Sequence, residues 1–174
     1  MSITDPERLL KRFKRARKAR ARWETVWQDA YDFTLPHRAQ LRTRGTPGRE
    51  NDRLFDATAP DAVDQLAASL LARLTPPWSR WFGLAVGDEI PSEEYRGAAA
   101  QLELATATLQ THFDRSNFSV EIHQCFLDLI TVGSASLLFE EAPVGEDSAL
   151  RFTAVPLEQA YFEEGPSGRL DVTF

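Results

Sequence analysis

Residues 4–31 carry the pattern that most constrains the fold, because apolar side chains recur there every three or four positions. That spacing is the period of an α-helix with one buried face. Thr4 and Glu7 form a capping box and Pro6 fits the first turn, so a helix is predicted from about Thr4 to Tyr31. At about 1.5 Å per residue, such a helix is roughly 40 Å long, enough to bridge neighbouring subunits or domains. Its apolar face is predicted to contain Leu9, Phe13, Ala16, Trp23, Trp27 and Ala30, and its opposite face Arg8, Lys11, Lys14, Arg15, Lys18 and Arg22.

A basic N-terminal segment precedes an acidic remainder. Residues 1–53 hold 14 basic and seven acidic side chains, whereas residues 54–174 hold six and 19, and the whole chain has a net charge of −6. Seventeen of the 20 basic residues are Arg, which suits fork-like contacts with phosphate or carboxylate groups. Residues 37–53 are predicted to form a long basic loop, whose candidate contact residues are Arg42, Arg44 and Arg49.

Three kinds of partner fit the basic face of the N-terminal helix. In order of preference, the face pairs with acidic surfaces of neighbouring subunits, binds the phosphate backbone of DNA, or lies on an anionic membrane. Trp23 and Trp27 are predicted to be core or interface anchors rather than base-stacking platforms. The candidate subunit or DNA contacts on this helix are Arg8, Lys11, Arg15, Lys18 and Arg22.

The middle of the chain predicts further helices. A helix over residues 58–74 begins with a capping box at Thr58 and Asp61, and Pro76-Pro77 end it. Residues 82–86 are a candidate strand, and two more helices are expected at about 92–115 and from Phe118 to Gly133. The predicted packing residues of this region are Val63, Leu66, Ala67, Leu70, Leu74, Trp81 and Phe82.

The last forty residues change from a helical period to strand-like alternation. Strands are predicted at 135–139, 150–155 and 169–174, separated by Gly, Pro and acidic turns. The sequence therefore predicts an α+β fold, in which a long N-terminal amphipathic helix and several core helices pack on a small antiparallel β meander. Its expected segments are a basic helix and loop at 1–53, a helical core at 54–134, and the meander at 135–174.

The sequence contains no pattern typical of catalysis or metal binding. The cysteine, Cys125, has a nearby His123 but no second Cys or zinc-like spacing, and its helical position predicts a packed thiol. Asp61 is explained by helix capping, and residues 45–49 lack the lysine of a phosphate-binding loop. A small enzyme would need His112 or His123 beside carboxylates, which the spacing does not predict. We expect no enzyme activity, cofactor or metal.

Several short stretches occur in a fixed order along the chain. They are LFDATA at 54–59, LAASL at 66–70, LTPP at 74–77 and WF at 81–82, followed by SNF at 116–118, LLFE at 137–140 and FTAVPL at 152–157. Taken together, these stretches resemble the head-to-tail connecting, or portal, proteins of short-tailed bacteriophages. The resemblance covers about residues 5–174, and its most specific part is the block from 54 to 82.

The resemblance implies a non-enzymatic subunit of a ring, typically of twelve copies, at one vertex of the capsid. A packaging motor threads double-stranded DNA inward through the channel of such a ring, and the DNA later leaves through the tail. The implied partners are further copies of the chain, capsid protein, tail or adaptor proteins, the motor and the DNA, with no membrane. The implied location is the virion, after synthesis in the bacterial host cytoplasm.

Portal proteins are several hundred residues long, so the resemblance implies that this sequence is their N-terminal, wing-side portion. The alternative is a stand-alone nucleic-acid-binding module that uses the basic helix.

Overall fold

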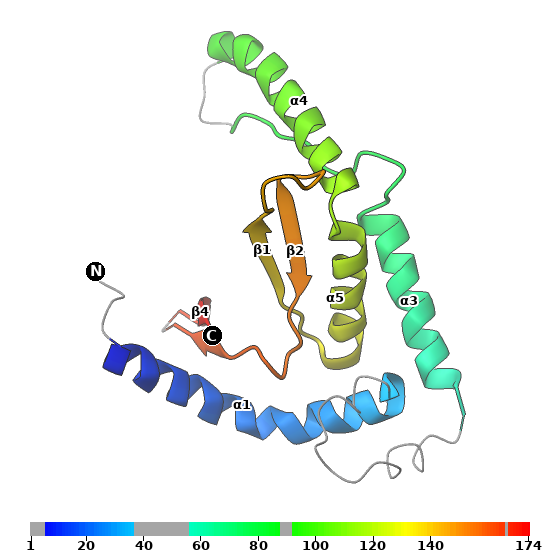
Figure 1. The fold of residues 1–174 in the computed structure, drawn as a ribbon, viewed down its shortest axis with the longest axis vertical. Helices are drawn as coiled ribbons and strands as arrows, with labels where there is room; N and C mark the ends of the chain where they lie inside the picture. Colours follow the sequence, from blue (N-terminus) through cyan, green and yellow to red (C-terminus); the bar gives the residue numbers. More distant parts are fainter. Residues whose placement is uncertain (1–5, 37–55, 88–91, 166) are drawn as a thin grey trace. The chain divides into compact units, whose positions relative to one another are not determined.

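The computed structural model describes residues 6–36, 56–87, 92–165 and 167–174. The predicted α+β class is confirmed, because helices form most of these residues and short strands follow them (Figure 1). The elements are α1 (Pro6–Thr34), α3 (Thr58–Leu74), α4 (Ser92–Arg115), α5 (Phe118–Val132), β1 (Leu137–Glu141), β2 (Leu150–Ala154), β3 (Phe162–Glu164) and β4 (Leu170–Thr173).

Helices α4 and α5 follow the predicted bounds, because local signals separate and end them. The hydroxyl of Ser116 accepts a hydrogen bond from the amide of Phe118 at 3.1 Å, which caps the start of α5. Gly133 ends α5 with φ of 75°, a left-handed conformation that favours glycine, and its amide donates to the carbonyl of Leu129 at 2.9 Å.

The strands are antiparallel, as predicted, but they form two separate hairpins instead of one meander. β1 pairs with β2, and β3 pairs with β4. β3 has no counterpart in the prediction, because its three residues are mostly acidic. The chain between β2 and β3 cannot extend a ladder, since Pro156 lacks an amide hydrogen and the carbonyls of Leu157, Glu158 and Ala160 are bonded to a side chain of α1.

Backbone contacts divide the chain into two compact units. Unit 1 comprises Met1–Leu66, Leu127–Ser136 and Val155–Phe174, and unit 2 comprises Ala67–Phe126 and Leu137–Ala154. Because each unit draws on stretches far apart in sequence, it gathers residues from more than one of the predicted segments. The predicted division at 53/54 and 134/135 stays a prediction.

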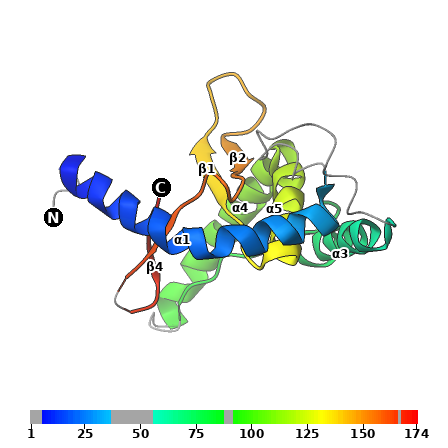
Figure 2. The ribbon, with the colours of Figure 1, turned by 90° about the horizontal axis from the view of Figure 1, so that it is seen from below.

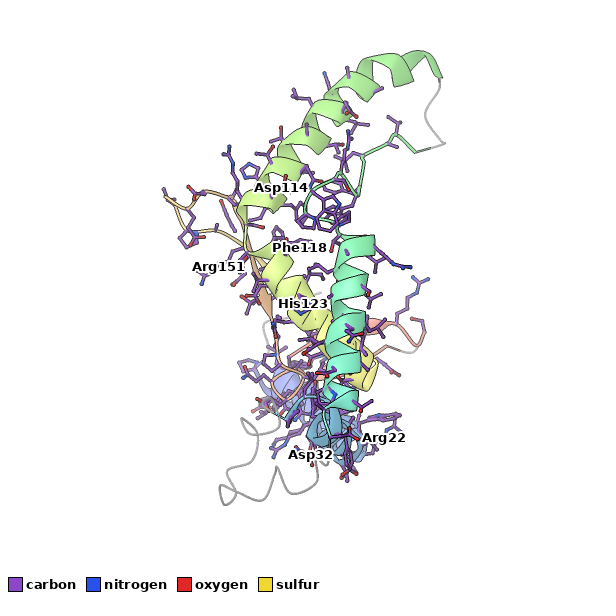
Figure 3. All side chains as sticks on the ribbon, turned by 90° about the vertical axis from the view of Figure 1, so that its right-hand side faces the viewer. Arg22, Asp32, Asp114, Phe118, His123 and Arg151 are labelled. Atoms are coloured by element: carbon purple, nitrogen blue, oxygen red, sulfur yellow. The ribbon has the colours of Figure 1, made fainter. Side chains whose placement is uncertain are left out.

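An aromatic cluster forms the core of unit 2. Phe118, at the start of α5 (Figure 3), stacks on Trp81 with ring centroids 5.6 Å apart and planes 6° apart. Phe152 of β2 is 6% exposed and stacks on Phe113 of α4 at 5.5 Å. Aromatic pairs at such separations add about 0.5–1.5 kcal/mol each beyond their buried area. The cluster therefore ties α4, α5 and the β1–β2 hairpin together, and its rings are Trp81, Phe82, Phe113, Phe118, Phe139 and Phe152.

The predicted strand at residues 82–86 is wrong. This stretch pairs with no strand; instead, the amide of Leu84 donates to the hydroxyl of Thr106 on α4 at 3.1 Å. Because a helix side chain satisfies the amide, the extended stretch packs along α4 without a ladder.

Helix α3 is buried less widely than its apolar pattern predicts. Val63 is 7% and Ala67 0% exposed, but Leu66 is 49% and Leu74 56% exposed, so the predicted burial of these two leucines is wrong. Leu70 is half-buried. The buried contact of α3 is narrow because it is made by residues one turn apart.

The predicted capping box at the start of α3 is also wrong, since the amide of Thr58 donates a hydrogen bond to the carboxylate of Asp56 at 2.9 Å.

Candidate interaction surfaces

Arg20 lies at the centre of the inner face of α1 and holds a turn from the far end of the chain. Its guanidinium donates to the carbonyls of Leu157 at 3.1 Å, Glu158 at 2.7 Å and Ala160 at 3.1 Å. It also bonds Glu24 at 2.7 Å and lies 3.8 Å from the ring centre of Tyr161. The Arg20 side chain is 10% exposed, so these contacts replace the water that the charge has lost.

Further contacts fix the rest of the inner face. Arg12 forms an ion pair with Glu163 of β3 at 2.5 Å, and both side chains are mostly buried. The ring of Phe13 lies edge-on to Tyr161, with centroids 5.0 Å apart. The β3–β4 hairpin accordingly lies beside α1, as Figures 1 and 2 show.

The C-terminal end of α1 is joined to the last turns of α5. The hydroxyl of Tyr31 donates to the carboxylate of Asp128 at 2.8 Å, and the hydroxyls of Thr34 and Thr131 lie 3.3 Å apart. Asp128 is 3% exposed, so this bond pairs a carboxylate that water cannot reach.

The outer face of α1 is the basic surface that the sequence predicts. Its predicted contact residues are all exposed, and Figure 3 shows Arg22 on this helix. Arg42, Arg44 and Arg49 lie outside the described residues. The role of all these cations as subunit or DNA contacts stays a prediction. The exposed cations of this predicted face are Arg8, Lys11, Lys14, Arg15, Lys18 and Arg22, of which Arg15 also lies 4.0 Å from the carboxylate of Glu163.

The predicted packing residues of α1 divide between two faces. Trp27 is 8% exposed, and Leu9 and Phe13 are half-buried on the inner face. Trp23 is 48% exposed, so its predicted packing is not made within the described chain. It belongs instead to a second apolar seam of α1. The members of this seam follow one another at intervals of four and three residues, and they are Ala19, Trp23, Val26, Ala30 and Phe33.

The β1–β2 hairpin has one closed edge and one open edge. On β2, the amide of Phe152 donates to Asn117 at 2.9 Å and its carbonyl accepts from Asn117 at 2.7 Å, while the amide of Ala154 donates to Glu121 at 2.7 Å. These bonds seal the outer edge of β2 against the start of α5. Within the described residues β1 pairs with β2 alone.

The open side of this hairpin and its turn are acidic and apolar. Leu138 is 45%, Phe139 59% and Val144 108% exposed. Four carboxylates are exposed on β1 and the turn, those of Glu140, Glu141, Glu146 and Asp147, and the exposed Arg151 of β2 lies opposite Glu140 and 4.0 Å from the carboxylate of Glu146. This part of the hairpin thus exposes carboxylates, one cation and apolar area, although the ring of Phe139 also packs on Phe152 at 5.4 Å.

The residues that the sequence offered as candidates for catalysis or metal binding make packing and hydrogen-bond contacts within the fold. Cys125 is buried, as its helical position predicts. The ring of His112 accepts a hydrogen bond from the amide of Ala149 at 3.2 Å, which serves the hairpin turn. Among the described residues, no three His, Cys, Asp or Glu side chains lie together as metal ligands. A pocket of about 440 Å³ in unit 2 is lined by Arg115, Arg151, Glu146 and Asp147 among others, so its charges balance.

Sequence patterns miss the residues that organise these surfaces. The sequence gives only a weak sign that Arg20 makes internal contacts, which is that this arginine falls on the apolar side of the helix with Ala16 and Trp27. Asn117 is read as a helix break, and nothing in its neighbourhood indicates that it binds β2.

No helix in the described part of the chain has the length and hydropathy needed to cross a membrane.

Comparisons with known proteins agree on one family. Residues 6–174 match the family described as bacteriophage head to tail connecting protein. The chain is 25% identical over 173 residues to the portal protein of Salmonella phage epsilon15, covering 98% of this chain and 30% of that protein. It is 28% identical over 136 residues to the probable portal protein of Bordetella phage BPP-1, covering 76% of this chain and 24% of that protein. The chain thus spans less than a third of the length of these relatives.

Proposed function

The chain belongs to the bacteriophage head to tail connecting protein family, and on that premise we propose that it is a structural subunit of a portal ring. The ring occupies one vertex of the capsid, and genomic DNA is packaged and ejected through it. The observation that carries this proposal is the family match along residues 6–174, which includes both compact units.

The proposal extends to the assembly around the ring. Copies of the chain associate through their sides into a ring of twelve, the number that the family resemblance implies. The ring contacts capsid protein on one side and tail or adaptor proteins on the other. The packaging motor docks on it during DNA entry. The protein is made in the host cytoplasm and ends in the virion, and its role is structural rather than enzymatic.

The surface features of the chain suit a subunit that binds copies of itself. A cyclic assembly needs two different surfaces that recognise each other, because a head-to-tail contact closes into a ring. The exposed cations of α1 and the exposed carboxylates of the β1–β2 hairpin provide groups of opposite charge, although Arg151 pairs with Glu146 within the hairpin. Opposite charges steer association and fix register more than they raise affinity.

The test is the solution mass of the purified chain, measured by light scattering from low to high salt. We expect a defined oligomer at low salt whose mass falls as salt screens the charges. The variant Arg15→Glu/Arg22→Glu is expected to lose assembly, while Arg17→Glu, a charge reversal on another side of α1, retains it.

DNA affinity is measured on the same two variants. Binding that is unchanged when assembly is lost supports the ring subunit. A chain that stays monomeric at every salt concentration and loses only DNA affinity in the Arg15/Arg22 variant contradicts the proposal.

A further inference from the structure

The edge of β1 that faces away from β2 is open within the described residues. The amide of Ala142 donates to the carbonyl of Ala149 at 2.9 Å in the register of the hairpin, so the bonded pairs of this ladder contain the even-numbered residues of β1. The backbone groups of Leu137, Phe139 and Glu141 therefore point away from β2. None of these groups has a hydrogen-bond partner in the described part of the chain.

The opposite edge of the same hairpin is closed by side chains. Asn117 bonds the outward amide and carbonyl of Phe152, and Glu121 bonds the outward amide of Ala154. β1 lies on the side of β2 away from α5, as Figure 1 shows, and receives no such bonds from the described residues. A free edge with apolar side chains is a template for another strand, and β1 contains neither the Lys nor the Pro that discourages pairing.

Residues 82–86 of the same unit are extended and also lack a partner strand. The amide of Leu84 is bonded to Thr106 on α4. Because successive residues of an extended chain direct their backbone groups to opposite sides, those of Gly83 and Ala85 point away from Thr106. Gly83 and Ala85 are exposed, and their backbone groups have no hydrogen-bond partner among the described residues. The apolar pattern of this stretch predicts a strand, and its free side can accept one.

The two free edges match in an antiparallel register. When Phe139 lies opposite Gly83 of a second copy, Leu137 lies opposite Ala85 of that copy. All four residues have outward backbone groups, so each of the two pairs exchanges its amide and carbonyl bonds. The ring of Phe139, which is 59% exposed, then covers a glycine, a cross-strand pairing that stabilises glycine at a sheet edge.

The side chains on the other face of β1 fit the same register. Leu138 is 45% exposed and lies opposite Leu84 of the second copy, which is 42% exposed, so the contact buries two apolar side chains together. Arg80 of the second copy is the diagonal neighbour of Glu140, within reach of a long side chain. A parallel register would place a glycine there instead of the cation, so charge favours the antiparallel direction.

We infer that the free edge of β1 binds residues 82–86 of a second copy of the chain, which become a third strand beside β1 and β2. This inference rests on the proposed function and names a lateral contact of the ring. The contact joins two different surfaces, so each end copy keeps one of them unoccupied and the assembly grows head to tail.

The first experiment exchanges the two leucines that face each other. Leu84→Lys and Leu138→Glu each place a charge against an apolar side chain, and we expect each variant to weaken association about tenfold or more. The double variant Leu84→Lys/Leu138→Glu places opposite charges in the pair and should recover association. Because both leucines are partly exposed, all three variants should fold, which circular dichroism and thermal unfolding check.

A backbone variant and a matched control test the hydrogen bonds. Ala85→Pro removes an amide that has no partner among the described residues, so it should leave the fold intact and abolish the bond to Leu137 of the second copy. We expect it to weaken association as much as Leu84→Lys. Leu104→Lys makes the same change at a residue that is 70% exposed and about 200° around α4 from Thr106, and it should assemble like the wild type.

Disulfide crosslinking tests the register directly. In a Cys125→Ser background, chains with Leu84→Cys are mixed with chains of different mass with Leu138→Cys and oxidised. A mixed disulfide is expected, because facing residues of non-bonded antiparallel pairs have Cα atoms about 4.5 Å apart. Leu104→Cys should not replace Leu84→Cys. Glu140→Cys and Val86→Cys, which face each other only in a parallel ladder, should not crosslink.

Every result bears on the inference. Full assembly of the single variants, or no recovery in the double variant, overturns the contact and leaves the portal proposal intact. Equal crosslinking by Leu104→Cys, or a crosslink between residues 86 and 140, also overturns it. A wild-type chain that neither associates nor crosslinks overturns both the contact and the ring.

Discussion

Replacing Arg20 with Met tests whether one arginine joins the first helix to the distant turn at residues 157–161. Met keeps the length of the aliphatic stem and removes the guanidinium. The substitution deletes the three bonds to the carbonyls of Leu157, Glu158 and Ala160, together with the contact over the ring of Tyr161.

The expected loss follows from these contacts. A hydrogen bond from a charged donor contributes about 1.5–3 kcal/mol after exchange with water. The three bonds do not count in full, because the carbonyl of Leu157 also accepts from the amide of Ala160 at 3.2 Å. The cation–π contact adds about 0.5–1 kcal/mol. Two bonds counted at the lower end of that range, together with the cation–π contact, lead us to expect that Arg20→Met lowers the free energy of unfolding of unit 1 by about 3.5–4 kcal/mol.

Urea titration with amide hydrogen exchange measures this loss. The reporter amides are Tyr161 and Phe174, which donate to each other's carbonyls at 2.9 and 2.8 Å. Arg20→Lys keeps the charge without the planar fork and should lose about half as much. Arg17→Met removes an exposed arginine of the same helix and should change stability by less than about 0.5 kcal/mol. If Arg20→Met costs no more than Arg17→Met, the reasoning is refuted.

Three further predictions concern single contacts. Asn117→Ala removes both side-chain bonds to the backbone of Phe152 and should destabilise unit 2 by about 1–3 kcal/mol, measured by urea unfolding; an unchanged midpoint would show that water replaces the amide without cost. Hydrogen bonding to Arg80 holds the pKa of Glu103 below its ordinary value, so this pair stabilises the fold above the ordinary pKa, and its contribution is lost as pH falls through the lowered pKa. Glu103→Gln should therefore flatten that part of the acid unfolding curve, and an identical curve would contradict the assignment. Gly133→Ala should lower stability by about 1 kcal/mol in thermal unfolding because its φ is 75°, whereas no change would mean that the turn relaxes.

The helices could be predicted where the sequence carries a local stop signal. Ser116 and Asn117 separate α4 from α5, and Gly133 ends α5, so both helices have the expected bounds. α3 has the expected bounds but not the expected burial, since periodicity shows that leucines share a side without showing how much of that side is covered. Leu66 lies on its apolar side and is nevertheless 49% exposed.

The contacts between distant segments could not be predicted. Arg20 bonds carbonyl groups 137–140 positions away, and every residue type carries such a carbonyl, so no side-chain pattern marks the turn it holds. The strand at residues 82–86 fails for a related reason, because its extended backbone is bonded by a helix hydroxyl instead of a neighbouring strand. Of the candidate surfaces, only the basic surface of α1 was predicted, because its cations recur with the period of a helix and so fall on one side of it.

The contacts of Arg12 and Arg20 can form only late in translation, because their partners lie near the other end of the chain. Their partners follow them by 151 and 137 residues, so at roughly 5–20 residues per second the ribosome needs about 7–30 seconds to supply them. During that interval the inner face of α1 emerges with neither the turn nor β3 available. The inner face of α1 therefore stays without these contacts until synthesis has passed Glu163.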